Sequence, residues 1–305
     1  MSADRKILLL GKNGQLGWEL QRALAPLGTL IALDRHSSEA CGDLADLDGL
    51  AATVAALRPE AIVNAGAYTA VDKAESDVDT ARRINAEAPA ALAHAARACG
   101  AWLIHYSTDY VFDGSGRDFR DEDAPTGPLN VYGQTKLDGE HAIRASGARH
   151  LILRTSWVHA ARGGNFARTM LKLAAERERL TVVDDQFGAP TGADLLADLS
   201  AHMLREALQR PADADTLSGV FHAVAAGQTS WHAYANHVID WARRHGQTLA
   251  VREIAPVPAS TFPTPARRPH NSRLSTGRLQ RVFGLTPPPW QAGVDRMLAE
   301  VLTPR

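Results

Sequence analysis

Short runs of apolar residues alternate with stretches of helical periodicity through the first half of the chain. The runs are apolar at consecutive positions and lie at 7–10, 30–33, 61–63, 102–106 and 151–154. Such runs are typical of strands that are buried on both faces of a parallel sheet. Between them, apolar side chains recur every three or four positions, as at Leu16, Leu20, Leu24 and Leu27. The alternation predicts right-handed βαβ units and an α/β fold with a Rossmann-type, doubly wound parallel sheet.

The alternation of apolar runs with helical stretches becomes less regular after about residue 157. We expect a helix over 167–178, a sixth strand over 180–184 and a helix over 193–208. The tail is rich in proline, a residue that is excluded from central strands and helix interiors. The pattern predicts a first domain over 1–156, to which segments around 180–220 return. The remainder, 157–305, is expected to form mainly a smaller, loop-rich lobe over the carboxyl edge of the sheet.

Composition excludes several classes of protein. The chain has 305 residues and a formal net charge of −1, so nothing in its charge favours nucleic acid or an anionic membrane as a partner. Its two cysteines, Cys41 and Cys99, form neither a disulfide framework nor a thiolate metal site. No apolar run approaches the ~20 residues of a membrane span, and none has the form of a signal peptide. We therefore expect a cytoplasmic enzyme or binding protein.

A glycine-rich run, Gly11-Lys-Asn-Gly14-Gln-Leu-Gly17, follows the first predicted strand and opens the first predicted helix. Glycines in this setting allow a tight turn and a close approach of the backbone to a pyrophosphate, whose charge lies at the helix N-terminus. The alternative is a turn whose glycines serve only helix–strand packing. The strand–loop–helix context favours a dinucleotide site.

Two further segments bear on the cofactor. Asp34 ends the second predicted strand, where a carboxylate bonds the adenosine ribose and favours NAD, whereas the adjacent Arg35 suits the 2′-phosphate of NADP. NADH and NADPH therefore both remain open. Asp43 and Leu44 are placed to contact the adenine, although an aspartate in a loop commonly just forms a turn.

A second constellation points to proton transfer. Thr108 and Asp109 end the fourth predicted strand, and Tyr132 and Lys136 follow four positions apart, on one face of a predicted helix. Reduction of a ketone by hydride produces an alkoxide that needs a proton, and a tyrosine is a serviceable acid. We expect Lys136 to stabilise the phenolate and to bond the nicotinamide ribose, and Thr108 to hold the substrate oxygen. Taken alone, a Tyr-x-x-x-Lys match is more often an ordinary surface feature.

Several longer motifs extend the picture, and they are spread along nearly the whole chain. They are the runs at 11–20, 69–75, 107–112, 130–136, 154–158, 185–192 and 263–274. In these motifs the sequence resembles the extended short-chain dehydrogenase/reductases and, within them, the dTDP-4-dehydrorhamnose reductases. The resemblance implies NAD(P)H-dependent reduction of the C4 ketone of dTDP-4-dehydro-6-deoxy-L-mannose to dTDP-L-rhamnose, the last step of dTDP-rhamnose biosynthesis.

The resemblance also implies site residues by position. The implied cofactor contacts are Gly14, Gln15, Leu16, Asp34, Asp43, Leu44, Ala67, Tyr68, Thr69, Tyr106, Tyr132 and Lys136. The implied substrate contacts are Thr108, Asp109 and Trp157. Tyr68 departs from the histidine that we expect in close relatives. Trp157 is alternatively a core residue.

The dTDP-sugar substrate and a possible metal follow from the same resemblance. Among Arg267, Arg268 and Arg273, at least one is expected to clamp the diphosphate. A magnesium ion at a subunit interface would match Glu19, Asp194 and Glu300, although Asp194 replaces an expected glutamate. A homodimer is therefore possible.

Three rival functions use the same fold. A sugar-nucleotide 4,6-dehydratase needs a second carboxylate after Asp109, where this chain has Tyr110. A 4-epimerase uses the same threonine, tyrosine and lysine, so only the subfamily motifs speak against it. A non-catalytic regulatory subunit of the methionine adenosyltransferase type would keep the nucleotide site without turnover.

Overall fold

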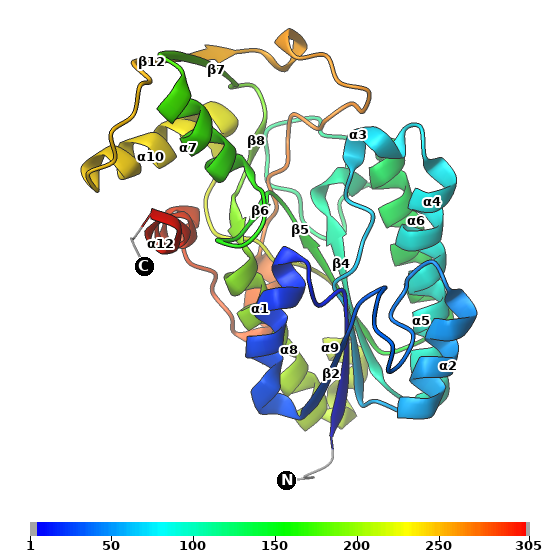
Figure 1. The fold of residues 1–305 in the computed structure, drawn as a ribbon. Coiled ribbons are helices and arrows are strands. Elements are labelled where there is room, and N and C mark those ends of the chain that lie inside the picture. Colours follow the sequence, from blue (N-terminus) through cyan, green and yellow to red (C-terminus); the bar gives the residue numbers. More distant parts are fainter. Residues whose placement is uncertain (1–4, 303–305) are drawn as a thin grey trace.

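A parallel sheet of six strands lies at the centre of the part of the chain that the computed structural model describes, residues 5–302 (Figure 1). The strand order is β10-β5-β4-β3-β1-β2. The strands are β1 (Lys6–Leu10), β2 (Thr29–Leu33), β3 (Ala61–Asn64), β4 (Trp102–Thr108), β5 (His150–Thr155) and β10 (Gly219–His222). Every pairing between them is parallel. The predicted fold class and the first five predicted strands are confirmed.

The predicted sixth strand is wrong in its placement. The segment 180–184 does contribute a strand, β7 (Arg179–Val183), but β7 pairs with β12 (Glu253–Val257) in a separate two-stranded sheet. Along β7 only alternate side chains, Leu180 and Val182, are buried. Such alternation suits a sheet with one face toward solvent. The edge position beside β5 is taken instead by β10, whose last three residues are buried.

Helices cover both faces of the central sheet (Figure 1). One face packs against α1 (Gln15–Leu24) and α8 (Ala193–Gln209), and the predicted leucine stripe of α1 contributes the fully buried Leu20 and Leu24. The other face packs against α2 (Leu47–Leu57), α5 (Ala88–Cys99) and α6 (Val131–Ser146). No helix within 5–302 has both the length and the apolarity needed to cross a membrane.

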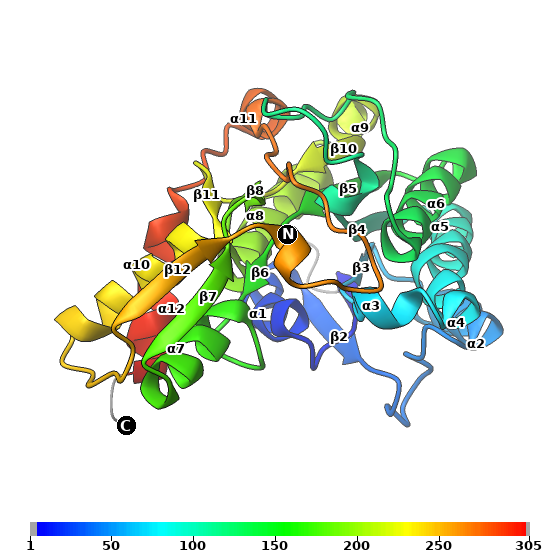
Figure 2. The same ribbon diagram turned by 90° about the horizontal axis from the view of Figure 1, so that it is seen from above.

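A second core lies beside the carboxyl edge of the sheet. It is built from α7 (Phe166–Glu176), α10 (Trp231–Arg244) and α12 (Trp290–Leu302), with buried Tyr234 and Trp290 among its members. The segment after β12 then runs across the top of the molecule toward α3 (Val71–Ala74), as Figure 2 shows. The domain boundary at 156–157 stays a prediction.

A buried ion pair joins α6 to the sheet. The Glu140 carboxylate accepts hydrogen bonds from Arg154 Nε at 2.9 Å and Nη2 at 2.6 Å, and the two side chains are 1% and 3% exposed. The Ser107 hydroxyl at the end of β4 donates to the same carboxylate. The pair therefore connects α6 with both β5 and β4 at the edge where the strands end.

We expect Glu140→Ala to lower the free energy of unfolding by roughly 3–5 kcal/mol, because the substitution leaves the Arg154 guanidinium buried without its partner. Urea denaturation followed by circular dichroism measures this loss. The control is Glu253→Ala, which removes a carboxylate from the exposed Arg179–Glu253 pair and is expected to change little. Equal effects of the two substitutions would contradict the role given to the buried pair.

Candidate active site

The glycine-rich loop has the conformation that its sequence predicts. Gly11 has a φ of +83°, and a Cβ there would lie 2.7 Å from Gly66 N. A Cβ on Gly17 would lie 2.0 Å from Gly11 O. Packing therefore accounts for these two glycines. A Cβ on Gly14 would meet its nearest neighbour at an ordinary 3.5 Å, so packing does not explain why this position lacks a side chain. Close approach of a ligand to the N-terminus of α1 does explain it.

A cavity of about 240 Å³ opens beside this loop. It brings together the predicted cofactor residues Gly11, Gly14, Asp34, Asp43, Leu44 and Ala67. Its remaining lining residues are Asn13, Arg35, Gly42, Gly66 and Ile84. Of these, only Arg35 was anticipated as a contact. Ile84 comes from η2 (Arg83–Glu87), a segment whose sequence gives no nucleotide-binding signal, so only the fold places it here.

Asp34 is held in a fixed orientation at the edge of this cavity. Its carboxylate accepts a hydrogen bond from His36 N at 2.9 Å and another from Asn13 Nδ2. The bond from the His36 amide is the main cause that lowers the pKa of this carboxyl. Asp34 is therefore ionised at neutral pH, with its oxygens ordered before any ligand arrives.

The remaining predicted cofactor residues lie outside the cavity lining. Gln15 Nε2 donates to Gly164 O at 3.4 Å, Leu16 packs against the core, and Thr69 is exposed. Tyr68 donates its hydroxyl to Asp77 at 2.9 Å. Tyr106 donates its hydroxyl to Ser200 of α8 at 2.7 Å, on the sheet face opposite α6. Cofactor contacts by these five residues stay predictions.

The carboxyl end of β4 faces the first turn of α6. Thr108 ends β4, Asp109 opens the short helix η3 (Asp109–Val111), and Thr108 Oγ1 donates to Asp109 Oδ1 at 3.1 Å. The Tyr132 hydroxyl lies close enough to the Thr108 hydroxyl for Thr108 to lower the pKa of the phenol. Asn130 caps α6 by accepting from Gly133 N at 2.7 Å. The structure thus brings Thr108, Tyr132 and the next-turn residue Lys136 to one place, as the sequence predicts.

Burial dominates the electrostatics of this centre. It is the main cause that raises the pKa of Tyr132 to about 12. The nearby Thr108 hydroxyl opposes this rise, and the charge of Asp109 adds to it. Burial also lowers the pKa of Lys136 to about 8, against the opposing charge of Glu140. Lys136 is not among the groups that shift the pKa of Tyr132 here, since its Nζ donates to Tyr106 O at 2.5 Å and lies 3.2 Å from His105 Nε2. Stabilisation of the phenolate by Lys136 stays a prediction.

Asp109 connects the centre to the C-terminal tail. Burial raises the pKa of its carboxyl to about 6, while hydrogen bonds from Ser272 and Thr108 lower it. Ser272 donates its hydroxyl to Asp109 Oδ2 across 163 positions of sequence. Ser272 was not anticipated as a site residue, although it lies within the motif at 263–274.

Trp157 has an unusual backbone and a stacked partner. Its φ of +49° is in the left-handed region, which is uncommon for a bulky residue and is often found at functional sites. Its ring stacks on Trp231 with centroids 3.6 Å apart and planes 13° apart. A Cβ on Gly188 would lie 2.8 Å from the same ring, so glycine is required there. Trp231 and Gly188 were missed because neither carries a local signal for this contact.

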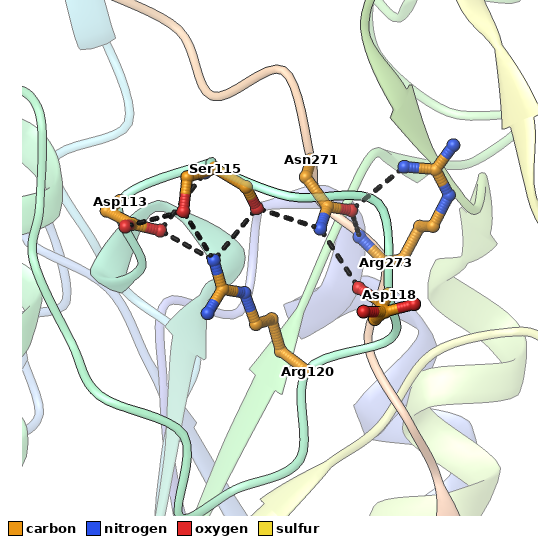
Figure 3. Close-up of polar contacts among 6 residues, drawn as sticks. All are labelled: Asp113, Ser115, Asp118, Arg120, Asn271 and Arg273. Carbon is orange, nitrogen blue, oxygen red and sulfur yellow. Dashed lines mark hydrogen bonds and ion pairs between the residues drawn. The ribbon is translucent and has the colours of Figure 1, made fainter.

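The loop after η3 is tied to the tail by a polar network (Figure 3). Asn271 Nδ2 donates to Ser115 O at 3.2 Å and to Asp118 O at 2.9 Å, and its Oδ1 accepts from Arg273 Nη1 at 3.0 Å. Arg120 donates to Asp113 Oδ1 at 2.7 Å. The network holds Arg273. Burial lowers the pKa of Arg273, and the charge of the nearby Arg117 lowers it further.

The other two tail arginines differ from Arg273. Arg268 makes a bidentate pair with Asp72, with Nη2 to Oδ2 at 2.7 Å and Nη1 to Oδ1 at 3.1 Å. Arg267 is exposed, and its backbone carbonyl accepts from Asn130 Nδ2 at 2.7 Å. Both contacts attach the tail to the sheet half of the molecule. Arg268 is therefore already paired with a carboxylate, and a diphosphate contact by Arg267 or Arg268 stays a prediction.

The three carboxylates matched to magnesium do lie together. Glu19, Asp194 and Glu300 line one small pocket, but Arg296 Nε lies 3.4 Å from Asp194 and 3.5 Å from Glu300. Among residues 5–302 no group of three or more acidic, histidine or cysteine side chains has an arrangement that could hold a metal ion. The donor set of one chain therefore does not fit a magnesium ion.

Comparisons with known proteins agree with this geometry. The family model described as RmlD substrate binding domain matches residues 5–303. A curated dTDP-4-dehydrorhamnose reductase from Shigella flexneri is 57% identical over 97% of this chain and 98% of its own length.

Two solved structures agree as well. The dTDP-4-dehydrorhamnose reductase of Clostridium acetobutylicum is 32% identical, with a TM-score of 0.86 over 98% of this chain and all of its own (100%). The enzyme of Bacillus anthracis, solved in complex with NADP, is also 32% identical, with a TM-score of 0.84 over 97% of this chain and 99% of its own. The chain therefore belongs to the RmlD family, the family of the dTDP-4-dehydrorhamnose reductases.

Proposed function

We propose that this chain reduces the C4 ketone of dTDP-4-dehydro-6-deoxy-L-mannose to give dTDP-L-rhamnose, the last step of dTDP-rhamnose biosynthesis. The observation that carries the proposal is the meeting of Thr108 and Tyr132 at the carboxyl end of β4, with Lys136 one turn along α6. Ligands of open parallel sheets bind at this edge. The 57% identity to a dTDP-4-dehydrorhamnose reductase over 97% of this chain supplies the substrate class.

A nicotinamide cofactor supplies the hydride when bound. The C4 oxygen gains negative charge as the carbonyl is reduced, and Tyr132 gives it a proton. With a pKa of about 12, the phenol is fully protonated at neutral pH, as an acid must be before it acts. Thr108, whose hydroxyl lies beside that of Tyr132, presents this hydroxyl to the same oxygen. A protonated Lys136 stabilises the phenolate that remains.

The cofactor is placed by the glycine loop and its cavity. Gly11, Gly14 and Gly17 set the turn for the pyrophosphate, Asp34 receives the adenosine ribose, and Asp43 and Leu44 receive the adenine. Arg35 is exposed beside Asp34 and suits a 2′-phosphate, so we propose that both NADPH and NADH are used. Glu19, Asp194 and Glu300 of one chain do not fit a magnesium ion, and a homodimer stays a prediction; the proposed proton transfer uses neither.

The substrate end is built from the tail and the smaller lobe. We propose that Trp157 offers an apolar platform to the deoxyhexose, with Trp231 behind it. Asp109 and Thr108 face the sugar at the end of β4. Arg273, together with Arg117, receives the diphosphate, since two guanidinium groups close enough to oppose each other's charge suit an anion between them.

Two rival functions make different predictions. A dehydratase needs a second carboxylate beside Asp109, but Tyr110 occupies that position and packs edge-on against Tyr132 at 5.6 Å. A regulatory subunit would bind the nucleotide without turnover. Purified protein, NADPH or NADH, and dTDP-4-dehydro-6-deoxy-L-mannose decide the matter by the loss of absorbance at the reduced-nicotinamide band. No oxidation of either cofactor would reject the reductase.

Removal of the Tyr132 hydroxyl tests the proton donor. We expect Tyr132→Phe to lower kcat by roughly 10²-fold or more while NADPH still binds, because only the proton-transfer step loses its acid. Steady-state kinetics and fluorescence titration with NADPH measure the two quantities. The control is Tyr234→Phe, which removes a buried hydroxyl without a hydrogen-bond partner and is expected to leave kcat unchanged. Near-normal turnover of Tyr132→Phe would refute the assignment.

The role of Asp34 is tested by cofactor preference. We expect Asp34→Ala to weaken NADH binding by about tenfold and NADPH binding by less, because the 2′-phosphate has other cationic partners such as Arg35. Dissociation constants for both cofactors, compared with those of the exposed Asp215→Ala variant, measure the effect. An equal loss for NADH and NADPH would count against this reading.

A further inference from the structure

A line of buried polar side chains lies behind Lys136. Asn64 ends β3, His105 lies within β4, and Lys136 projects from α6; each of the three residues is 1% exposed. Asn64 Nδ2 is 3.3 Å from His105 Nδ1, and His105 Nε2 is 3.2 Å from Lys136 Nζ. His105 is not part of the proton transfer described above, yet it makes the closest side-chain contact to the lysine amine.

The direction of each hydrogen bond follows from a single backbone amide. Gly66 N donates to Asn64 Oδ1 at 3.2 Å, and a backbone N–H can only donate. The Asn64 oxygen is therefore turned toward Gly66, and its NH₂ group faces His105. Since an amide NH₂ only donates, His105 Nδ1 must accept. A neutral imidazole carries one proton, so that proton is on Nε2, which faces Lys136.

This polarity creates a conflict at the lysine. An ammonium group has only donors, and the Nε2–H group is also a donor. A neutral amine resolves the conflict, because its lone pair accepts from Nε2–H while one N–H donates to Tyr106 O at 2.5 Å. Burial, which lowers the pKa of Lys136 to about 8, also favours the amine, but the ammonium would still predominate at neutral pH without the hydrogen-bond polarity set by Asn64.

The other charged groups around Lys136 do not restore its ammonium form. Glu140 lies one turn further along α6 and favours the ammonium, but it is shared with Arg154 and Ser107. Tyr132 and Asp109 lie on the side of the reacting centre, where burial raises the pKa of both. Burial holds the pKa of His105 itself well below its usual range, so the imidazole is neutral whether or not Lys136 is charged.

We propose that His105 is a positioning residue that acts through Lys136: held by Asn64 with its proton on Nε2, it keeps the resting lysine neutral. The active ammonium forms when the amine takes the Nε2 proton, one proton from water is taken up at Nδ1, and the bond to Asn64 is released. The proposal rests on the proposed function, in which a charged Lys136 stabilises the Tyr132 phenolate.

The first test reads the tautomer directly and needs no activity. In protein labelled with ¹⁵N-histidine, long-range ¹H–¹⁵N correlation spectra distinguish Nε2–H from Nδ1–H rings, and the His105 signals are those lost in His105→Gln. We expect the Nε2–H tautomer in the ligand-free wild-type protein at neutral pH. An Nδ1–H or doubly protonated ring would overturn the proposal, whatever the activity of the enzyme.

The second test reverses the tautomer. Asn64→Asp keeps an acceptor for Gly66 N and places a second acceptor at Nδ1, so the ring becomes Nδ1–H and Nε2 accepts from the ammonium. The ammonium is the form needed for reduction, and activity is lost as pH rises through its titration. We therefore expect the alkaline limb of the kcat–pH profile to move upward by about one pH unit, with little change in KM for the cofactor.

Asn165→Asp is the matched control, because Asn165 caps α7 and aspartate caps equally well. Asn165→Asp is expected to change neither the His105 tautomer nor the alkaline limb of the kcat–pH profile. An unmoved limb in Asn64→Asp with a reversed tautomer would disprove the link between His105 and Lys136. A wild-type protein without reductase activity would instead reject the proposed function, while the tautomer result still decides the resting state of His105. If Asn64→Asp does not fold, the wild-type spectrum alone decides that state.

Discussion

The buried pair of Glu140 and Arg154 fixes where α6 lies against the carboxyl ends of β4 and β5. Thr108 belongs to β4 and Tyr132 to α6, so their hydroxyls meet only while these two elements keep their separation. Ser107, the residue before Thr108, bonds the same Glu140 carboxylate. A single charged pair therefore positions the strand end and the helix that together hold the reacting groups.

Burial gives the centre its chemical character. It raises the pKa of Tyr132 and Asp109 and lowers that of Lys136, so it favours the neutral form of all three groups. In such surroundings a charge that develops on the substrate oxygen is costly unless a proton reaches it at once. In the proposed reaction the ketone therefore meets a protonated acid, Tyr132, and a lysine whose charge we infer to be set by His105.

The C-terminal tail completes the site by contacts with residues far away in sequence. Ser272 bonds Asp109, Asn271 bonds the loop at Ser115, and Arg268 bonds Asp72. Asp72 lies in the motif at 69–75, and in the fold it anchors the tail to the sheet half. Because these contacts bridge the two halves of the molecule, the substrate end depends on how the halves are joined.

The sequence by itself determined the parallel sheet, the glycine loop and the placing of Tyr132 and Lys136 one turn apart on a helix, because each rests on local periodicity or spacing. Strand runs, the strand–loop–helix order and the four-residue step from Tyr132 to Lys136 are all fixed within a few turns of chain. Only the tertiary structure decided that β10, and not the segment at 180–184, completes the sheet. It likewise decided that Trp231 supports Trp157, that burial raises the pKa of Tyr132, and that His105 faces Lys136. These features depend on which distant segments exclude water from one another and on which donors then face which acceptors, and no local pattern of residues specifies either.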